Sequence, residues 1–192
     1  MNNELTVLLE KFTCGDDNQA EDSAKVISSF GDMIIPKLEY LLESQVEDER
    51  WWAVRTLSLM EDPPYDQIIR MLGDDSVEVR KCAALAILNH PTVSALDLLV
   101  DLLEDYDPLM ANLAANALIS IGASAVSKIL DKLGELEGLA RIEAFRALAK
   151  IGDTGAISVF FSGLNDQSHL VAYWSEEGLT KLAMDMVYLQ PG

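Results

Sequence analysis

Cysteine, proline and basic residues are scarce in this chain of 192 residues. The two cysteines, Cys14 and Cys82, lie far apart and are too few for a disulfide scaffold, so we expect free thiols in a reducing cytoplasm. No apolar run reaches the roughly 18 residues that span a bilayer. The N-terminal stretch MNNELTVLLEKFTCG lacks the basic start and the cleavage site of a secretory signal. The sequence therefore predicts a cytoplasmic protein that does not associate with membranes.

Positive charge is outweighed by negative charge along the whole chain. There are 14 Lys and Arg residues against 32 Asp and Glu residues, which gives a formal net charge of −18. Residues 1–110 hold 23 of these acids and 8 of the bases. Such a field repels phosphate backbones and anionic lipids, so nucleic-acid binding is not expected. Two interpretations stay open: the acids keep an apolar repeat protein soluble, which we favour, or they attract a basic partner to the N-terminal half.

The usual signatures of catalysis and of metal or cofactor binding are also missing. His90 and His169 lie far apart and neither is followed by glutamate, while the acidic run 15–22 lacks the alternate spacing of a calcium loop. No glycine-rich phosphate loop with its lysine is present. No histidine stands beside either cysteine to activate a thiolate. We therefore predict no catalytic residue, no metal and no cofactor, and a binding protein rather than an enzyme.

What the chain does contain is a repeat of 30 or 31 residues. One apolar anchor recurs with this period, and its six members are Ile27, Leu57, Ile87, Leu118, Leu148 and Leu179. A fixed period in this range is typical of stacked repeats, in which each unit covers the apolar face of its neighbour.

Each repeat is predicted to hold two helices. The first, or A, helix carries small residues before its anchor, and a glycine or proline break follows it. The second, or B, helix carries a leucine ladder with an apolar residue four positions earlier, which places both on one buried face. The ladder leucines are Leu42, Leu72, Leu103, Leu133 and Leu164, preceded by Leu38, Ile68, Leu99, Ile129 and Phe160. Acidic turns after the B helices suit the positive N-terminal ends of the next A helices.

These patterns predict an all-α fold, a right-handed α-solenoid or superhelix of about six helical hairpins with an N-terminal cap helix. We expect a single domain over residues 1–192, with the cap in residues 1–15. The repeats are expected near 16–44, 45–74, 75–105, 106–135, 136–166 and 167–192, and the last is too short for a full B helix.

The stretch DDSVEVRKCAALAILNH resembles the HEAT-like repeat of the phycobilisome (PBS) lyase family, and similar stretches recur along nearly the whole chain. The arginine of that motif is matched by Arg50, Arg80 and Arg141, and its acidic column by Asp74, Asp105, Glu135 and Asp166. The resemblance implies an armadillo-like stack stiffened by ion pairs between repeats. Because Ala20, Ala111 and Ala172 replace the arginine elsewhere, we expect that ladder to be broken.

Two sets of residues are candidates for partner binding. On the concave face of the B helices, columns beside the buried ladder are expected to point outward, and its candidate residues are Tyr40, Arg70, Met71, Leu98, Asp101 and Leu102. The alternative is contact with the adjacent B helix. In the A helices, Trp51 and Tyr173 share one repeat column and are candidate anchors, the alternative being that both are core residues.

The predicted function is that of a non-enzymatic scaffold or assembly factor, which docks a protein partner on the B-helix face. If the acidic N-terminal half receives this partner, we expect the partner to be basic. The resemblance implies an alternative, namely a subunit of a phycobilin lyase or isomerase that acts on phycobiliproteins. Such enzymes commonly work as pairs of repeat proteins, so the alternative includes a heterodimer with another repeat protein.

Overall fold

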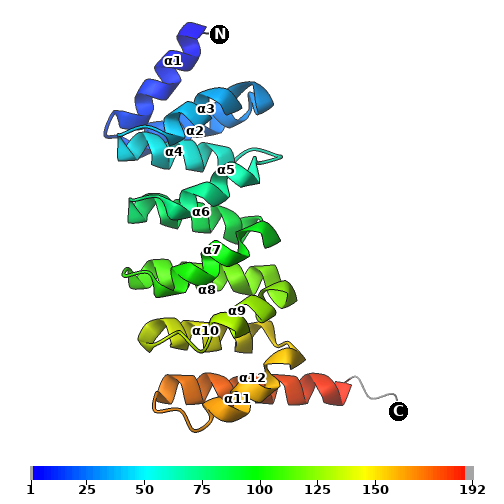
Figure 1. Cartoon of the computed structure of the whole chain (residues 1–192). Helices are drawn as coiled ribbons and strands as arrows, with labels where there is room; N and C mark the ends of the chain where they lie inside the picture. Colours follow the sequence, from blue (N-terminus) through cyan, green and yellow to red (C-terminus); the bar gives the residue numbers. More distant parts are fainter. Residues whose placement is uncertain (1, 189–192) are drawn as a thin grey trace. The chain divides into compact units, whose positions relative to one another are not determined.

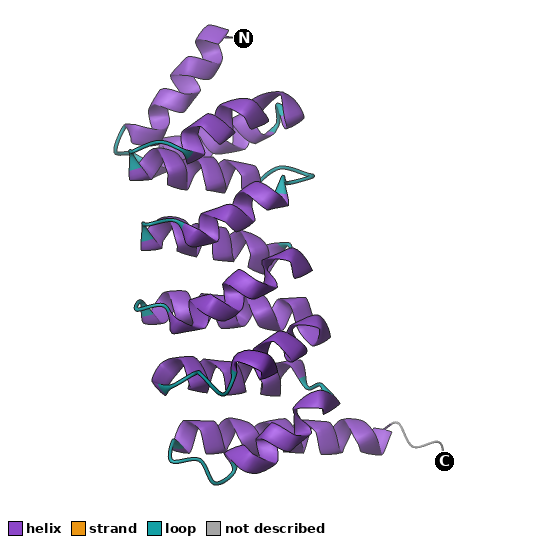
Figure 2. Ribbon diagram, viewed as in Figure 1, coloured by secondary structure: helices purple, strands orange, loops and turns teal. Residues whose placement is uncertain are grey.

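The computed structural model describes the backbone of residues 2–188 and the side-chain burial of residues 4–183. Helices and short connections make up all of this described part, which contains no strand (Figure 2). The predicted all-α class is therefore confirmed. The helices group into two compact units, Met1–Asn89 and His90–Gly192, and each unit is described by itself.

The first unit begins with the predicted N-terminal helix and continues with two helical hairpins and one further A helix (Figure 1). Its helices are α1 (Asn2–Glu10), α2 (Asp17–Ser28), α3 (Ile35–Leu42), α4 (Glu47–Ser58), α5 (Tyr65–Arg70) and α6 (Val77–Asn89). The A helices α2, α4 and α6 pack side by side, with α4 in the middle and α3 also against it. The B helix α5 is short and continues as the 3₁₀ turn η3 (Met71–Gly73).

The second unit repeats the same hairpin. Its helices are α7 (Leu96–Asp101), α8 (Pro108–Ile121), α9 (Val126–Lys132), α10 (Gly138–Ile151), α11 (Ile157–Gly163) and α12 (His169–Tyr188). The A helices α8, α10 and α12 pack in sequence order, and α11 lies against α12 (Figure 1). The stretch MDMVYLQPG was expected to follow the sixth A helix, but α12 continues as a single element to Tyr188. The remainder, 189–192, lies outside the described residues.

Acidic residues start the A helices as the sequence predicts. The carboxylate of Asp16 accepts hydrogen bonds from the backbone N–H groups of Asn18 and Gln19 at 3.0 and 3.2 Å. At the start of α8, Asp107 caps the next two backbone N–H groups at 2.9 and 3.0 Å. Each cap satisfies amides that have no partner inside their own helix.

The helix ends between A and B helices use the glycines that the sequence marks. Gly152 ends α10 with φ +74°, a conformation that side chains with a Cβ atom rarely adopt. From α12, the ammonium group of Lys181 donates hydrogen bonds to the carbonyl oxygens of Lys150 and Ile151 at 2.5 and 3.3 Å. A lysine at this position satisfies the last carbonyls of α10 and suits the negative end of its dipole.

The predicted ladders form the core of each unit. The anchors Ile27, Leu57, Ile87, Leu118 and Leu148 are fully buried, and so is the first rung of every B helix. Two residues are exceptions, because Leu164 is 41% exposed and the sixth anchor, Leu179, is partly exposed, although the ladders predict burial. No B helix follows α12 among the described residues, so the outer rung of α11 lacks the cover that a further hairpin would supply.

The stretch Pro108–Lys132 is long and apolar enough, by length and composition, to cross a membrane. It is nevertheless not one continuous α-helix, because the 3₁₀ segment η6 (Gly122–Ala125) separates α8 from α9. Its apolar residues Met110, Leu118 and Ile129 are fully buried in the second unit. The stretch therefore has the features of core helices in a repeat stack.

Candidate functional site

Two open depressions lie side by side along the B-helix side of the first unit. The Met71 pocket has a volume of about 310 Å³ and is lined by Leu42, Glu43, Ser44, Gln45, Arg50, Arg70, Met71, Gly73, Asp74 and Asp75. The Tyr40 pocket has a volume of about 590 Å³ and is lined by Pro36, Glu39, Tyr40, Glu43, Asp66, Gln67 and Arg70. Glu43 and Arg70 belong to both, so the two pockets form one continuous surface.

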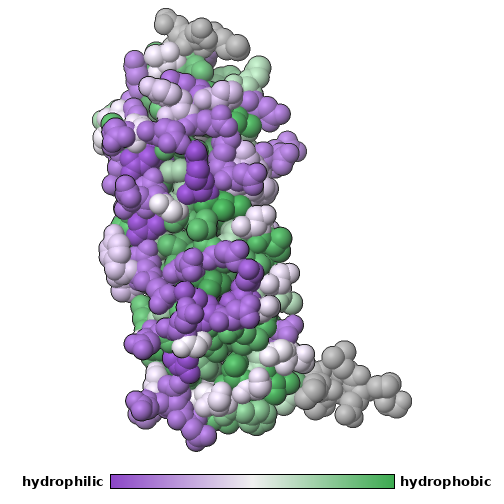
Figure 3. Space-filling view, viewed as in Figure 1, coloured by the Kyte–Doolittle hydropathy of each residue, from purple (hydrophilic) through white to green (hydrophobic). Residues whose placement is uncertain are grey.

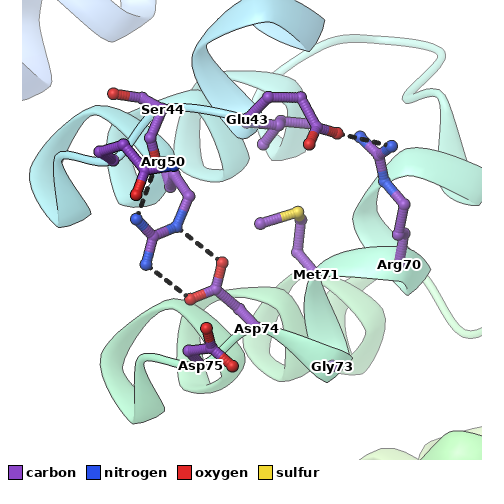
Figure 4. Close-up of a pocket in the computed structure, with 10 residues that line it drawn as sticks. Glu43, Ser44, Arg50, Arg70, Met71, Gly73, Asp74 and Asp75 are labelled. Atoms are coloured by element: carbon purple, nitrogen blue, oxygen red, sulfur yellow. Dashed lines mark hydrogen bonds and ion pairs between the residues drawn. The ribbon is translucent and has the colours of Figure 1, made fainter.

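The inner wall of the Met71 pocket is a buried ion pair between consecutive repeats (Figure 4). Arg50 in α4 donates two hydrogen bonds to the carboxylate of Asp74, at 2.8 and 2.9 Å, and a third to the backbone carbonyl of Ser44 at 2.9 Å. The bond to Asp74 is the main cause that raises the pKa of Arg50. This fork of charge-assisted bonds fixes the turn before α4 to the turn before α6.

The other motif arginines brace their repeats in a similar way. Arg141 pairs with Asp166 at 3.0 Å and donates to the carbonyl oxygen of Leu133 at 3.2 Å. Arg80 donates to the carbonyl oxygens of Asp74 and Asp75 at 2.8 and 3.2 Å. These arginines therefore hold the turn that precedes their own helix, a role that the acidic columns alone did not reveal.

The boundary between the two pockets is a second ion pair of a different kind. Arg70 and Glu43 approach to 2.8 Å across the pocket rim (Figure 4). Their side chains are 54% and 68% exposed, so water screens this contact. Both groups can exchange partners at little cost, which suits residues that meet another molecule.

The Tyr40 pocket combines an exposed ring with acidic and amide groups. Tyr40 is 70% exposed, and the ammonium nitrogen of Lys37 lies 4.8 Å from its ring centroid. The Gln67 side-chain amide donates a hydrogen bond to Glu39. Its own oxygen Oε1 is buried and has no hydrogen-bond partner among the described residues. The pocket thus offers an aromatic face and carboxylates.

The structure corrects the expected position of Met71. Its side chain points into the pocket that carries its name, but the residue is only 5% exposed, where the sequence pattern predicts an outward position. Its place at the start of the 3₁₀ turn η3 does not explain this burial, because Leu72 in the same turn is buried as the leucine ladder predicts. Leu41 lies one repeat earlier, at the equivalent position of the regular helix α3, and is also buried at 6%, so this position faces the core in the first unit.

The remaining B-helix candidates belong to the second unit. Leu98 in α7 is 38% exposed, and Asp101 is exposed with its carboxylate 3.9 Å from Lys132. Leu102 begins the 3₁₀ turn η5 (Leu102–Glu104) and is partly buried. On the face shown in Figure 3, hydrophilic atoms predominate over the first unit, whereas hydrophobic atoms gather around the B helices of the second.

The two aromatic pairs of the A helices keep one ring partly open in each case. Trp51 is partly exposed and meets the buried Trp52 edge-on, with ring centroids 4.6 Å apart. Tyr173 is 49% exposed and meets Trp174 edge-on at 5.0 Å. The column therefore holds rings that are neither wholly core nor wholly surface, and their role in binding stays a prediction.

The two cysteines differ in their access to solvent. Cys82 is buried in α6, and burial raises the pKa of its thiol to about 12. Cys14 is exposed, and its thiol contacts the backbone oxygen of Asp16 at 3.8 Å. Over the described residues, no group of three or more His, Cys, Asp or Glu side chains is arranged to hold a metal ion.

Sequence reasoning missed the polar half of the Tyr40 pocket. Glu39, Glu43, Asp66 and Gln67 were not among the candidates, although they line the pocket beside Tyr40. The sequence did contain a signal for two of them, because Glu39 and Glu43 lie four residues apart and therefore on one side of α3.

Comparison with known proteins gives the class of fold. A family model of HEAT repeats matches residues 35–119. No curated protein matches the sequence. A crystal structure of an engineered protein aligns with 94% of this chain and 98% of its own, at 21% identity and a TM-score of 0.55. The YibA protein of Escherichia coli aligns with 95% of this chain and 68% of its own, at 17% identity and a TM-score of 0.53.

A designed armadillo repeat protein, solved in complex with the peptide (KR)4, aligns with 93% of this chain and 99% of its own, at 20% identity and a TM-score of 0.51. Together with the HEAT-repeat match, these structures show that the chain has a helical repeat fold of the HEAT and armadillo class. Repeat proteins of this class commonly serve as protein-binding scaffolds.

Proposed function

We propose that the protein is a non-catalytic scaffold that binds a basic segment of a partner protein. Its docking surface in the first unit consists of the Tyr40 pocket and the Met71 pocket, which meet at the Glu43–Arg70 pair. The observation that carries the proposal is the 70% exposed ring of Tyr40 beside carboxylates in an open depression. Aromatic rings with a polar rim are typical anchors in protein interfaces.

The charge of the docking surface favours a basic occupant. Five carboxylates line the two pockets, from Glu39, Glu43, Asp66, Asp74 and Asp75. They face two lining arginines, one of which is committed to its buried ion pair. The residual charge is negative, as is that of the whole chain at −18. Such a field raises the association rate of a cationic partner and repels an anionic one.

The rigidity of the surface supports the same function. Because Arg50 and Asp74 fix the turns on both sides of the Met71 pocket, the pocket is formed before a partner arrives. A preformed surface loses less conformational entropy on binding than a mobile one. The designed armadillo protein that was solved with (KR)4 illustrates that this class of fold can hold a basic peptide, although its likeness to this chain extends to the fold alone.

The second unit supplies further candidates to the same proposal. Leu98, Asp101 and Leu102 combine apolar and acidic groups along α7 and η5, and Tyr173 is a possible anchor on α12 by its exposure of 49%. We include them as candidate contacts of a protein partner on the second unit. The proposal places the protein in the cytoplasm, in keeping with its sparse cysteines.

Fluorescence anisotropy with a labelled basic peptide tests the docking surface. The probe is fluorescein-(Lys-Arg)4, and the test variant combines Tyr40→Ala, Glu39→Gln and Asp66→Asn. We expect this variant to bind about tenfold more weakly than the parent, since it loses an anchor ring and two charges. Glu176→Gln with Glu177→Gln, two exposed acids of the second unit, controls for net charge. Equal affinity of the parent and the folded triple variant would refute the docking surface.

The alternative is a subunit of a phycobilin lyase or isomerase, and it depends on the resemblance of DDSVEVRKCAALAILNH to that family's repeat. The burial of Cys82 removes that thiol from any covalent role in the native fold. Adding a free bilin, with and without a candidate partner repeat protein, tests the alternative. A red-shifted absorbance band would support it, and an unchanged spectrum in both cases would count against it.

A further inference from the structure

A further depression in the first unit shares no lining residue with the docking surface. It has a volume of about 350 Å³ and is lined by Asp17, Glu47, Asp48, Trp51, Trp52 and Glu78, and we call it the Trp51 pocket. Its residues come from three A helices, because Asp17 begins α2, Glu47 begins α4 and Glu78 lies in the first turn of α6. The pocket therefore opens where three packed A helices begin, next to the turns that follow the B helices α3 and α5.

The base of the Trp51 pocket is a fixed pair of indole rings. Trp52 is 7% exposed and stacks on Phe12, with ring centroids 5.8 Å apart and an interplanar angle of 20°. Trp51 is held against Trp52 at 78°. The backbone oxygen of Trp51 also receives the Cys82 thiol at 3.9 Å. A large apolar ring that stays partly exposed lacks part of the stabilisation that full burial would give.

The rim of the pocket is negative. Among the described residues, the carboxylates of Asp17, Glu47 and Asp48 form no ion pair, whereas Glu78 pairs with Lys81 at 3.0 Å. Each helix N-terminus contributes about half a positive charge, which accounts for first-turn acids as helix stabilisers without any ligand. Stabilisation of the helix dipole therefore explains the acidic residues, but it does not explain the partly exposed indole of Trp51. Three unpaired carboxylates still outweigh the three helix ends, so the potential over the ring stays negative.

We propose that the Trp51 pocket receives an arginine side chain of a partner protein. A cation over an indole face is attracted by the ring quadrupole, and tryptophan gives the strongest such interaction. Arginine fits better than lysine, because its planar guanidinium stacks on an aromatic ring while its five N–H donors reach several carboxylates at once. The carboxylates here come from separate helices around the ring, an arrangement that a single ammonium group would use only in part.

This inference goes beyond the proposed docking surface and stands independently of it. The two surfaces have no residue in common, so each can fail without the other. A partner with two basic segments could engage both surfaces, and linkage of the two contacts would then raise its apparent affinity.

Three matched peptides test the Trp51 pocket in the full chain. Their sequence is acetyl-Gly-Ser-X-Ser-Gly-amide, in which X is arginine, lysine or citrulline, the neutral isostere of arginine. Binding is followed by the shift of the Trp51 indole N–H signal in ¹⁵N-labelled protein, assigned with the Trp52→Phe and Trp174→Phe variants. We expect the arginine peptide to bind about fivefold more tightly than the citrulline peptide, and also more tightly than the lysine peptide.

Two variants complete the test. Glu47→Gln with Asp48→Asn keeps both rings and removes two rim charges, and we expect it to weaken arginine-peptide binding at least about threefold. Tyr40→Ala alters only the other surface and should leave the titration unchanged. Equal shifts from arginine and citrulline, equal affinity for lysine and arginine, or no effect of the charge-neutral variant would each overturn the assignment. In the last case the acids act as helix stabilisers only.

Discussion

The Met71 pocket contains two arginine–carboxylate pairs that differ mainly in burial, and this contrast gives a quantitative prediction. Arg50 and Asp74 are 15% and 6% exposed, whereas Arg70 and Glu43 are 54% and 68% exposed. The shortest contact is 2.8 Å in both pairs. We therefore expect alanine substitutions to separate the effect of burial from that of distance.

The expected magnitudes follow from what each substitution leaves behind. Arg50→Ala removes three hydrogen bonds and leaves the Asp74 carboxylate buried with only the Ser76 backbone N–H as a donor at 2.8 Å. Hydrogen bonds to charged groups contribute about 1.5–3 kcal/mol each and are not additive, so we expect a loss of about 3 kcal/mol in the free energy of unfolding. Arg70→Ala should cost less than about 1 kcal/mol, as is usual for exposed pairs.

Double-mutant cycles measure the coupling energy of each of the two ion pairs directly. Urea unfolding in a Trp174→Phe background makes tryptophan fluorescence report on Trp51 and Trp52, which both belong to the first unit. We expect a coupling energy of about 2 kcal/mol for Arg50–Asp74 and about 0.5 kcal/mol for the Arg70–Glu43 pair. Coupling energies that agree within about 0.5 kcal/mol would show that burial does not set the strength of these pairs.

Three further outcomes are expected. Gly178→Ala should lower the melting temperature, because the new methyl group would lie 2.6 Å from the buried ring of Phe160, and overpacking of this kind costs about 1–3 kcal/mol; an unchanged melting curve would contradict this. Iodoacetamide at about pH 8 should label Cys14 and spare Cys82 in the native protein, as checked by mass spectrometry with and without urea, because burial raises the pKa of Cys82 to about 12. The hydrogen bond donated by Arg55 lowers the pKa of Glu21 from 4.5. The contribution of Glu21 to stability is therefore complete above that value and is lost as pH falls through the lowered pKa. The difference in unfolding free energy between the parent and Glu21→Gln should therefore shrink on acidification, and a constant difference would be inconsistent with this linkage.

The fold could be predicted from the sequence because one pattern of apolar residues recurs along the chain. A period of 30 or 31 residues identified the anchors, and those from Ile27 to Leu148 are all fully buried. The pattern was wrong for Leu164, because periodicity assumes that every hairpin has a following neighbour. That condition does not hold where the described helices end with α12.

The candidate site was predicted less well, and for a local reason. Tyr40 and Arg70 do lie exposed on the B-helix side, whereas Met71 is buried although the same columns predicted exposure. The equivalent residues Leu41 and Met71 both pack into the core of the first unit, so the buried face of these B helices is wider than the leucine ladder alone indicates. The polar lining of the Tyr40 pocket also depends on which repeats adjoin, and a single helical column does not contain that information.

The position of the acids along their helices distinguishes the two surfaces. At the Trp51 pocket, Glu47 and Asp48 occupy the first turn of α4, where the helix dipole favours negative charge by about 0.3–1 kcal/mol each. At the Tyr40 pocket, Glu39 lies in the last turn of α3 and Glu43 caps its C-terminus, where the same dipole opposes them. The first set stabilises its helix without a ligand, so at the Trp51 pocket only the partly exposed indole ring indicates that a ligand binds. The second set is unfavourable for its own helix. Arg70 offsets the charge of Glu43 within the chain, and the proposed basic partner would offset that of Glu39.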